Sequence, residues 1–559
     1  MKALTKFISI SPKSFFILTA ISILSGILKS VSILLIIPLL NLLNLDVKDN
    51  SVIQYFTMFL NYFNLNYNFT NTVFFIFFTS LIAVSIIYFS MYFFQKTVIG
   101  VLIDQRKQYL DRFTNIRWDR FHKLKSGEII NASVDQAPKA FSSGFIDTIN
   151  FISFVLQSAI MLFFAFLISP LFMVLAMCGG LLSYLFFSLV NKQIIKYSNE
   201  VNEYNKTYTI KLSETFHIIK SLITLNKLQF WNNAIHKIQK NYSRSMIKLY
   251  MFSQFPVQYR ETFTIMLIGV LTLFVINWQL TDLTTFATLL ILFQRAASYI
   301  GQAQNLYQSI LKMEVYYDDF NESKKMLEKN TDNSGELGST NLTDINKFEK
   351  NIEFKDVYLE YEGTQIINGI SFNIKKGSTF LLKGESGKGK TSIIDILIGL
   401  ISPTKGSIEI DGKDIKNLNK LTWRKKISYL SQKPELFNAT MKENILFFNN
   451  KKTEDEIEKS IKLSGVNKFI DDLDKGINTN VGEFGNKLSG GQKQRTAISR
   501  IIDLEKDIFI FDEPTSSLDD VSGDVIVNLV KFLKEKHKTI MLISHSSKFD
   551  SLADQILQI

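Results

Sequence analysis

The chain has 559 residues, and its 63 Lys and Arg residues against 52 Asp and Glu residues give a formal net charge of +11. Hydrophobic residues make up 46% of the chain and its mean hydropathy is +0.11, which excludes a disordered protein. The single cysteine, Cys178, excludes an intramolecular disulfide framework and a cysteine-based zinc site, while the length predicts several domains.

Long apolar runs dominate the first part of the chain, and most of them reach the length needed to span a membrane, about 20 residues. The runs cover residues 15–43, 73–94, 145–168, 171–190, 263–278 and 283–299. The fifth run is short unless its less apolar flank extends the same helix. The first run is too long for a signal peptide and further runs follow it, so we expect it to be retained. Together the runs predict six transmembrane helices.

Basic residues are distributed unevenly between these runs. They are abundant between the second and third runs, from Arg106 to Lys139, and between the fourth and fifth, from Lys192 to Arg260. The connector after the first run has one basic residue, Lys48. Because positively charged loops stay on the cytoplasmic side, we expect the N-terminus, both basic loops and everything after the sixth run to be cytoplasmic. Contact with anionic membrane lipids then accounts for the positive charge, and we expect no nucleic-acid partner.

The two basic loops have the periodicity of helices. Residues 105–121 and 197–230 alternate apolar and charged side chains at helical spacing, so we expect the spans to continue as helices beyond the membrane. After the sixth run, a polar helix leads into a stretch rich in Asn, Asp, Ser and Thr, which is typical of a linker. We therefore predict an all-α six-helix transmembrane domain at 1–325, a linker at 326–350 and an α/β domain at 351–559.

The α/β domain contains a glycine-rich phosphate-binding motif. An apolar strand at 379–383 is followed by G-E-S-G-K-G-K-T at 384–391 and then by an apolar helical run. This order of strand, G-x-x-x-x-G-K-T and helix is a P-loop, in which backbone N–H groups at the helix start bind phosphates. We expect Lys390 to bridge the β- and γ-phosphates of ATP and the Thr391 hydroxyl to bind Mg²⁺. The candidate phosphate-binding residues are Gly384, Glu385, Ser386, Gly387, Lys388, Gly389, Lys390, Thr391 and Ser392.

Two carboxylates follow a second apolar strand. Residues 508–511 form a continuous apolar run, as expected of a strand that is covered on both faces, and Asp512 and Glu513 come directly after it. A P-loop needs an acidic partner that holds the metal, so we expect Asp512 to bind Mg²⁺ through water. We expect Glu513 to act as the general base on the attacking water.

The sequence L-S-G-G-Q at 488–492 lies between these motifs and precedes a helix. Together with the P-loop, it resembles the signature of ABC ATPases. The resemblance implies roles for further residues: Gln432 resembles the Q-loop glutamine, His545 the switch histidine, Asp519 the D-loop aspartate and Tyr361 the aromatic residue that stacks on adenine. The implied catalytic residues are Glu513, His545 and Gln432, the implied metal ligands are Thr391, Gln432 and Asp512, and the implied ATP contacts are the P-loop, Tyr361, Ser489, Gly490, Gly491, Gln492 and Asp519.

The resemblance extends over nearly the whole chain and indicates a half-transporter of the exporter type. Segments 434–445 and 481–485 are typical of exporters, and segments 126–128 and 213–215 resemble the flanks of their coupling helices. Because the family places the signature of one ATPase domain against the P-loop of another, this chain with one of each is expected to dimerise. A homodimer is the simplest expectation, and a heterodimer is the alternative. One departure is Ser546, which follows His545 where an Arg is common.

The resemblance implies ATP-driven export or flipping of an amphipathic substrate by alternating access, with a peptide or bacteriocin as one candidate cargo. The alternatives are a lipid or lipid-linked glycan flippase, a multidrug exporter, and an ATP-gated channel or regulator. Ionisable residues inside membrane spans are costly and usually functional. Lys29 and Arg295 are such residues, and we expect them to line the cavity and to favour an anionic cargo, or alternatively to have a structural role.

Overall fold

The computed structural model describes residues 2–42, 51–121, 123–168, 170–278, 283–330, 342–361, 363–385, 387–433, 435–449, 451–515 and 520–559. Contacts divide the chain into two compact units. One comprises Met1–Ile116 and Lys123–Thr331, and the other comprises Arg117–His122 and Asp332–Ile559. The division at Thr331 falls inside the predicted linker. A short segment from the first basic loop therefore belongs by its contacts to the second unit.

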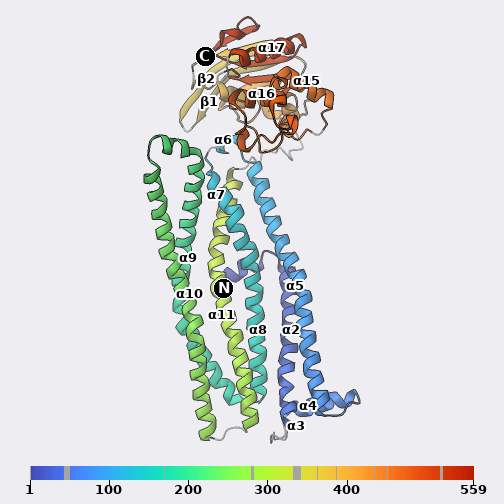
Figure 1. Ribbon diagram of the computed structural model, residues 1–559, viewed down its shortest axis with the longest axis vertical. Helices are drawn as coiled ribbons and strands as arrows, with labels where there is room; N and C mark the ends of the chain where they lie inside the picture. Colours follow the sequence, from blue (N-terminus) through green and yellow to red (C-terminus); the bar gives the residue numbers. More distant parts are fainter. Residues whose placement is uncertain are drawn as a thin grey trace. The chain divides into compact units, whose positions relative to one another are not determined.

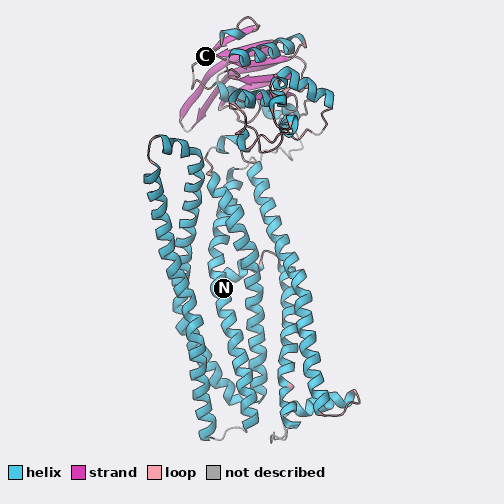
Figure 2. Cartoon of the chain, in the orientation of Figure 1, coloured by secondary structure: helices cyan, strands magenta, loops and turns pink. Residues whose placement is uncertain are grey.

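The described residues of the first unit form helices joined by short loops (Figures 1 and 2). Its elements are α1 (Lys2–Ile8), α2 (Pro12–Leu34), α3 (Ile36–Leu42), α4 (Ser51–Tyr62), α5 (Phe69–Thr114), α7 (Ser126–Asn131), the π-helical segments η1 (Ala132–Gln136) and η2 (Pro138–Ser143), α8 (Gly144–Ile168), α9 (Pro170–Thr224), α10 (Leu228–Trp278) and α11 (Leu283–Asn330). Among the described residues, three stretches are long and apolar enough to cross a membrane, namely 12–39, 69–114 and 126–168. The membrane-type helical region is confirmed, whereas the number of six spans stays a prediction.

The helices extend far beyond the predicted spans. α9 has 55 residues and α10 has 51, and a short turn at 225–227 joins them. At 1.5 Å per residue, α9 is about 80 Å long, against about 30 Å for the hydrocarbon core of a bilayer. The prediction that the basic loops continue the spans as helices is confirmed for this pair. Of the two ionisable residues predicted inside spans, Arg295 is exposed on α11, and the side chain of Lys29 lies outside the description.

The helical unit is held together along α8 and α11, which pack against each other over much of their length. Met161, Leu289 and Leu292 are fully buried between them. Gly26 marks the close approach of α2 to α8, because a Cβ atom there would lie 2.5 Å from Cγ of Gln157. The two π-helical segments lie on either side of Ala137, and η2 begins at Pro138, which lacks the N–H that a regular helix would use.

The second unit contains two sheets, as the predicted α/β domain requires (Figure 2). The antiparallel sheet has the order β2-β1-β4-β5, and the parallel sheet has the order β6-β7-β8-β3-β9. The strands are β1 (Asn351–Tyr361), β2 (Thr364–Lys375), β3 (Thr379–Lys383), β4 (Lys405–Ile410), β5 (Lys413–Asp414), β6 (Ile427–Leu430), β7 (Ile508–Asp512), β8 (Thr539–Ile543) and β9 (Gln555–Gln558). The helices are α6 (Trp118–Phe121), α12 (Lys390–Leu397), α13 (Lys420–Arg424), α14 (Met441–Leu446), α15 (Glu454–Ser464), α16 (Gly490–Ile501) and α17 (Asp520–Glu535), and the 3₁₀ turns are η3 (Ile415–Asn417), η4 (Val466–Lys468), η5 (Ile470–Asp472), η6 (Gly476–Asn478), η7 (Glu483–Gly485) and η8 (Ser547–Phe549).

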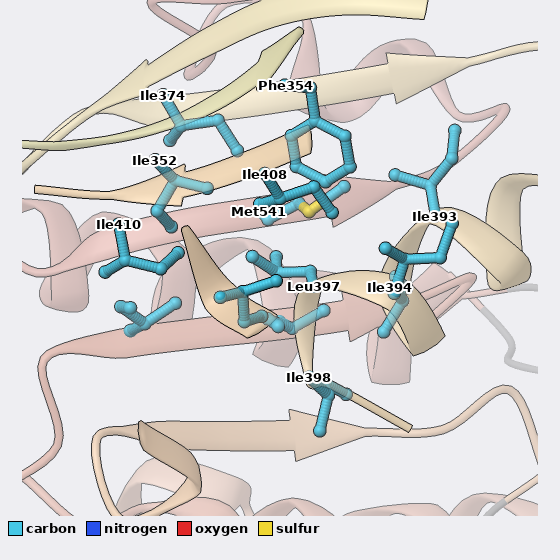
Figure 3. Close-up of a cluster of buried hydrophobic side chains, with 14 of the residues drawn as sticks. Ile352, Phe354, Ile374, Ile393, Ile394, Leu397, Ile398, Ile408, Ile410 and Met541 are labelled. Carbon is cyan, nitrogen blue, oxygen red and sulfur yellow. The ribbon is translucent and has the colours of Figure 1, made fainter. Parts of the chain in front are cut away.

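Helix α12 is fixed between the two sheets by its apolar side chains. Ile393, Ile394 and Leu397 are fully buried and meet residues of both sheets, including Phe354 and Met541, as Figure 3 shows. The central strands β7 and β8 are buried at every position, which explains their continuous apolar sequence. The core therefore fixes the end of β3, the start of α12 and the end of β7 relative to one another.

Candidate active site

The loop from β3 to α12 is shaped by glycines. Gly387 and Gly389 have φ angles of +87° and +79°, which lie in the left-handed region that favours glycine. A Cβ atom on Gly389 would also lie 2.9 Å from the carbonyl oxygen of Ile366, so the backbone has no room for a side chain there. Helix α12 begins at the next residue, Lys390. The result is a narrow backbone loop whose N–H groups precede a buried helix.

Lys390 connects this loop to the end of the parallel sheet. Its side chain is only 7% exposed. Its ammonium group donates to the carbonyl oxygen of Gly384 and lies 2.8 Å from Nε2 of His545 and 3.7 Å from Oε1 of Glu513. Glu513 and His545, which are far from Lys390 in the sequence, thus both lie beside its ammonium group.

Asp512 ends β7 and faces the start of α12. It is buried, and the Thr391 hydroxyl donates to its Oδ2 at 3.1 Å. Burial raises the pKa of the Asp512 carboxyl, the charge of Glu513 raises it further, and the hydrogen bonds from Thr391 and Tyr429 oppose this rise. Burial, together with the charge of Asp512, also raises the pKa of Tyr429. Tyr429 was not among the predicted site residues, although its position in strand β6, three residues before Gln432, could have indicated it.

Glu513 has a backbone conformation that is unusual for glutamate. Its φ is +45°, and its N–H donates to the carbonyl oxygen of Ile543 at 2.9 Å. Such a conformation costs roughly 1–3 kcal/mol and is common at functional sites. The side chain accepts a hydrogen bond from Nε2 of Gln432 at 2.7 Å, and Oε1 lies 3.6 Å from Nε2 of His545. The adjacent carboxylates therefore have different partners, Thr391 for Asp512 and Gln432 with His545 for Glu513.

Helix α16 presents a capped N-terminus. Ser489 is the N-cap: its hydroxyl accepts from the Gln492 N–H at 3.3 Å, and the Gln492 side chain accepts from the Ser489 N–H at 2.9 Å. The space around Gly490 is open, since a Cβ atom there would meet nothing within 4 Å. The side chains of Ser489 and Gln492 thus each accept a hydrogen bond from the backbone N–H of the other residue. A further residue, the buried Gln494, donates to the carbonyl oxygen of Pro514 and ties α16 to the segment after Glu513.

The remaining predicted site residues fall into three groups. Tyr361 ends β1, where it packs on the core and lies near the charges of Arg117, Asp119 and Arg120 of the α6 segment. Burial raises its pKa. In the loop, Glu385 and Lys388 are exposed and Gly384 is buried, and Thr391 is exposed in the first turn of α12. Gly389, Ser392 and Gly491 are half-buried. Ser386 and Asp519 lie outside the described residues.

The predicted flanks of the coupling helices also meet. The hydroxyls of Ser126 on α7 and Ser213 on α9 lie 3.3 Å apart. A Cβ atom on Gly127 would lie 2.9 Å from Cα of Ile210, so glycine allows the two helices to approach closely. Both segments belong to the helical unit, whereas α6 belongs by its contacts to the second unit.

Comparisons with known proteins agree with this geometry. Residues 367–516 match the family described as ABC transporter. The chain is 40% identical over 211 residues to ABC transporter B family member 3 of Dictyostelium discoideum, a match that covers 37% of this chain and 15% of that protein. It is 27% identical over 486 residues to the ATP-dependent lipid A-core flippase of Francisella novicida, covering 84% of this chain and 79% of the flippase. A solved structure, that of a bacterial Atm1-family ABC exporter with ATP bound, has a TM-score of 0.76 at 18% identity, over 98% of this chain and 93% of that one. The last likeness shows the fold of the chain.

Proposed function

This chain is an ABC half-transporter of the exporter type, and from that premise we propose that its dimer uses ATP to move an amphipathic lipid across a membrane. The ATPase domain implies binding of ATP and hydrolysis. The substrate, the dimer and the catalytic residues are our inference. The observation that carries the proposal is the meeting of Lys390, Glu513, His545 and Gln432 beside the Thr391–Asp512 pair.

The loop fits a nucleotide phosphate and its metal. The backbone approach at Gly389 supports a phosphate cradle, because only glycine fits beside the Ile366 carbonyl. The Thr391 hydroxyl, the Asp512 carboxylate and the Gln432 amide oxygen are the oxygen donors that Mg²⁺ prefers, and we propose that they hold it directly or through water. Bound MgATP supplies an activated phosphoryl group whose transfer to water releases free energy.

The chain's own residues act around that phosphoryl group. Lys390 exchanges its present carbonyl partner for phosphate oxygens and neutralises their charge. The carboxylate of Glu513, which accepts a hydrogen bond from Gln432, takes a proton from the attacking water. His545, beside Glu513, orients the terminal phosphate. Tyr361 stacks on the adenine ring. The loop residues Gly384, Glu385, Ser386, Gly387, Lys388, Gly389 and Ser392 surround the phosphates, chiefly through backbone N–H groups.

A second copy completes the site. The open N-terminus of α16, with the Ser489 hydroxyl and the N–H groups of Gly490 and Gly491, suits the exposed side of the γ-phosphate. In one chain the cap closes on Gln492 instead. We therefore propose a homodimer in which each P-loop faces the α16 terminus and Asp519 of the partner copy.

The membrane region is proposed to have six spans, with its N-terminus and ATPase domain in the cytoplasm. The long α2, α5, α8, α9, α10 and α11 helices and the basic residues of their connectors support this arrangement. For the substrate, the similarity to the lipid A-core flippase named above favours a lipid over the peptide or bacteriocin considered from the sequence.

The proposal is tested with the variant Glu513→Gln in the purified full chain, reconstituted in lipid vesicles. We expect MgATP to bind as in the unaltered protein, while hydrolysis falls roughly 10²–10⁴-fold because the general base is lost. Lipid flipping, followed with a fluorescent phospholipid and an external reductant, falls with it. The matched control is Glu505→Gln, an exposed glutamate away from the loop, which leaves both rates unchanged. Unchanged hydrolysis in Glu513→Gln would falsify the assigned base.

A further inference from the structure

The short helix α4, which connects α3 with α5, has three distinct faces. Phe56 is 7% exposed and Leu60 is fully buried, and they pack against Leu35 of the helical bundle. A second stripe, Tyr55, Met58 and Tyr62, is strongly exposed, with Tyr62 at 84%. A third stripe is polar and has Gln54, Thr57 and Asn61 at the same helical spacing. One face is thus anchored in protein, one is aromatic and exposed, and one is polar.

Aromatic contacts hold α4 rigidly at the ends of two long helices. Figure 1 shows it lying crosswise to α2 and α5 where these helices end. Phe56 meets Phe75 of α5 edge to face at 6.0 Å, and Phe59 meets the same ring at 5.5 Å. The hydroxyl of Tyr67, in the following loop, donates to the Pro38 carbonyl at 2.7 Å. The exposed stripe therefore has a fixed direction relative to the bundle.

The aromatic face of α4 continues into the exposed flank of α5. Phe59 contacts Phe63 at 5.1 Å and Phe75 at 5.5 Å, and Phe74 contacts Phe75 and stacks on Phe78. Further along, Phe77 and Leu81 are 72% and 67% exposed on α5, which is apolar enough to cross a membrane and has few buried side chains. A surface that joins the membrane-crossing flank of α5 to α4 lies at the depth where that apolar helix ends.

This part of the chain also lacks charge. From Ser51 to Gln95 the sequence has no Asp, Glu, Lys, Arg or His. An exposed aromatic face without charged neighbours is poorly suited to water. Aromatic residues with a polar tip, such as Tyr55 and Tyr62, are enriched at the boundary between lipid headgroups and acyl chains.

We propose that α4 is an interfacial helix whose Tyr55–Met58–Tyr62 face binds the lipid surface at the end of the predicted first and second spans, with the Gln54–Thr57–Asn61 face in water. Because Phe56 and Leu60 hold α4 to the helical bundle, binding of α4 to the lipid surface also fixes the depth of α2 and α5 in the bilayer. The occupant is the headgroup and upper acyl region of phospholipids. This binding surface is separate from the ATPase site, so it stands or falls independently of the proposed catalytic residues.

The test places a single environment-sensitive probe on each face of the full chain. In a Cys178→Ser background, Tyr62→Cys and Met58→Cys mark the aromatic face, and Asn61→Cys, also exposed, marks the polar face. Each variant is labelled with a nitrobenzoxadiazole dye and reconstituted in phosphatidylcholine nanodiscs containing lipids spin-labelled at the headgroup or at a shallow acyl carbon. Basal ATPase activity checks folding. Because Met58→Cys is a modest change, it keeps the test valid if Tyr62→Cys does not fold.

We expect spin-labelled lipids to quench the probes at 58 and 62 at least about two-fold more than the probe at 61, and aqueous iodide to show the opposite order, as an interfacial helix requires. Equal quenching of the two faces by lipid and by iodide overturns the proposal, because the aromatic face is then in water. Probes at 58 and 62 that neither quencher reaches also overturn it, because protein, such as a second copy, then covers the face.

Discussion

At the scale of single residues, the site consists of polar groups that bond to one another. Lys390 is held by the Gly384 carbonyl and His545, and Glu513 is held by Gln432. Several of these partners were predictable, because each follows a strand end or a glycine-rich motif. Tyr429 and Gln494 were not predicted, since their importance depends on contacts with Asp512 and Pro514, which are far away in the sequence.

Tyr429 leads to a prediction about pH. The carboxyl of Asp512 already has a raised pKa because it is buried, and the Tyr429 hydroxyl opposes that rise. A raised pKa means that Asp512 takes up a proton as the pH falls while an ordinary aspartate is still ionised. Tyr429→Phe keeps the ring and removes the donor, so the pKa of Asp512 rises further. We expect the KM for Mg²⁺ in ATP hydrolysis to increase at acid pH, and the increase to begin at a higher pH in Tyr429→Phe. An identical pH profile in both proteins would show that Tyr429 does not tune Asp512.

At the scale of elements, the sequence predicted the helices and strands whose formation depends on the pattern of neighbouring residues. The buried strand β7, the helix after the P-loop and the long continuation of α9 all follow from runs of apolar residues or from their spacing. The π-helical turns around Pro138 and the contacts of α6 with the second unit carried no such signal. They depend on how segments that are distant in the sequence pack against one another, and no local pattern of residues indicates this packing.

The β3–loop–α12 unit gives a prediction about glycine. Gly389→Ala forces a residue with a side chain into a left-handed conformation and places its Cβ 2.9 Å from the Ile366 carbonyl. Gly412→Ala, in the turn between β4 and β5, is the matched control, because Gly412 has a similar φ of +80° but open space around it. The backbone term, about 1–2 kcal/mol, is shared by both variants. We therefore expect both to lower the thermal stability, and only Gly389→Ala to weaken ATP binding, by about tenfold or more, because the loop must shift. Equal ATP affinities in the two variants, measured by calorimetry, would contradict the cradle.

At the scale of the whole molecule, each chain of the proposed dimer supplies one half of each of two sites. The polar groups around Lys390 gather at the end of the parallel sheet. At the α16 terminus, Ser489 is bonded to Gln492, and the space around Gly490 is open. The sequence predicted both halves from their motifs. In the dimer that we propose, the P-loop of one copy meets the α16 terminus of the other, a pairing that no motif of the single sequence specifies.

The central claim is therefore that hydrolysis requires two chains. The most direct measurement is the rate of ATP hydrolysis per chain over a dilution series of the purified protein, with the fraction of dimer determined at each concentration by mass photometry. We predict a rate that rises and falls in proportion to the dimer fraction, because each P-loop needs Ser489 and the neighbouring N–H groups of a partner copy. A monomer that hydrolyses ATP at the full rate would contradict the account.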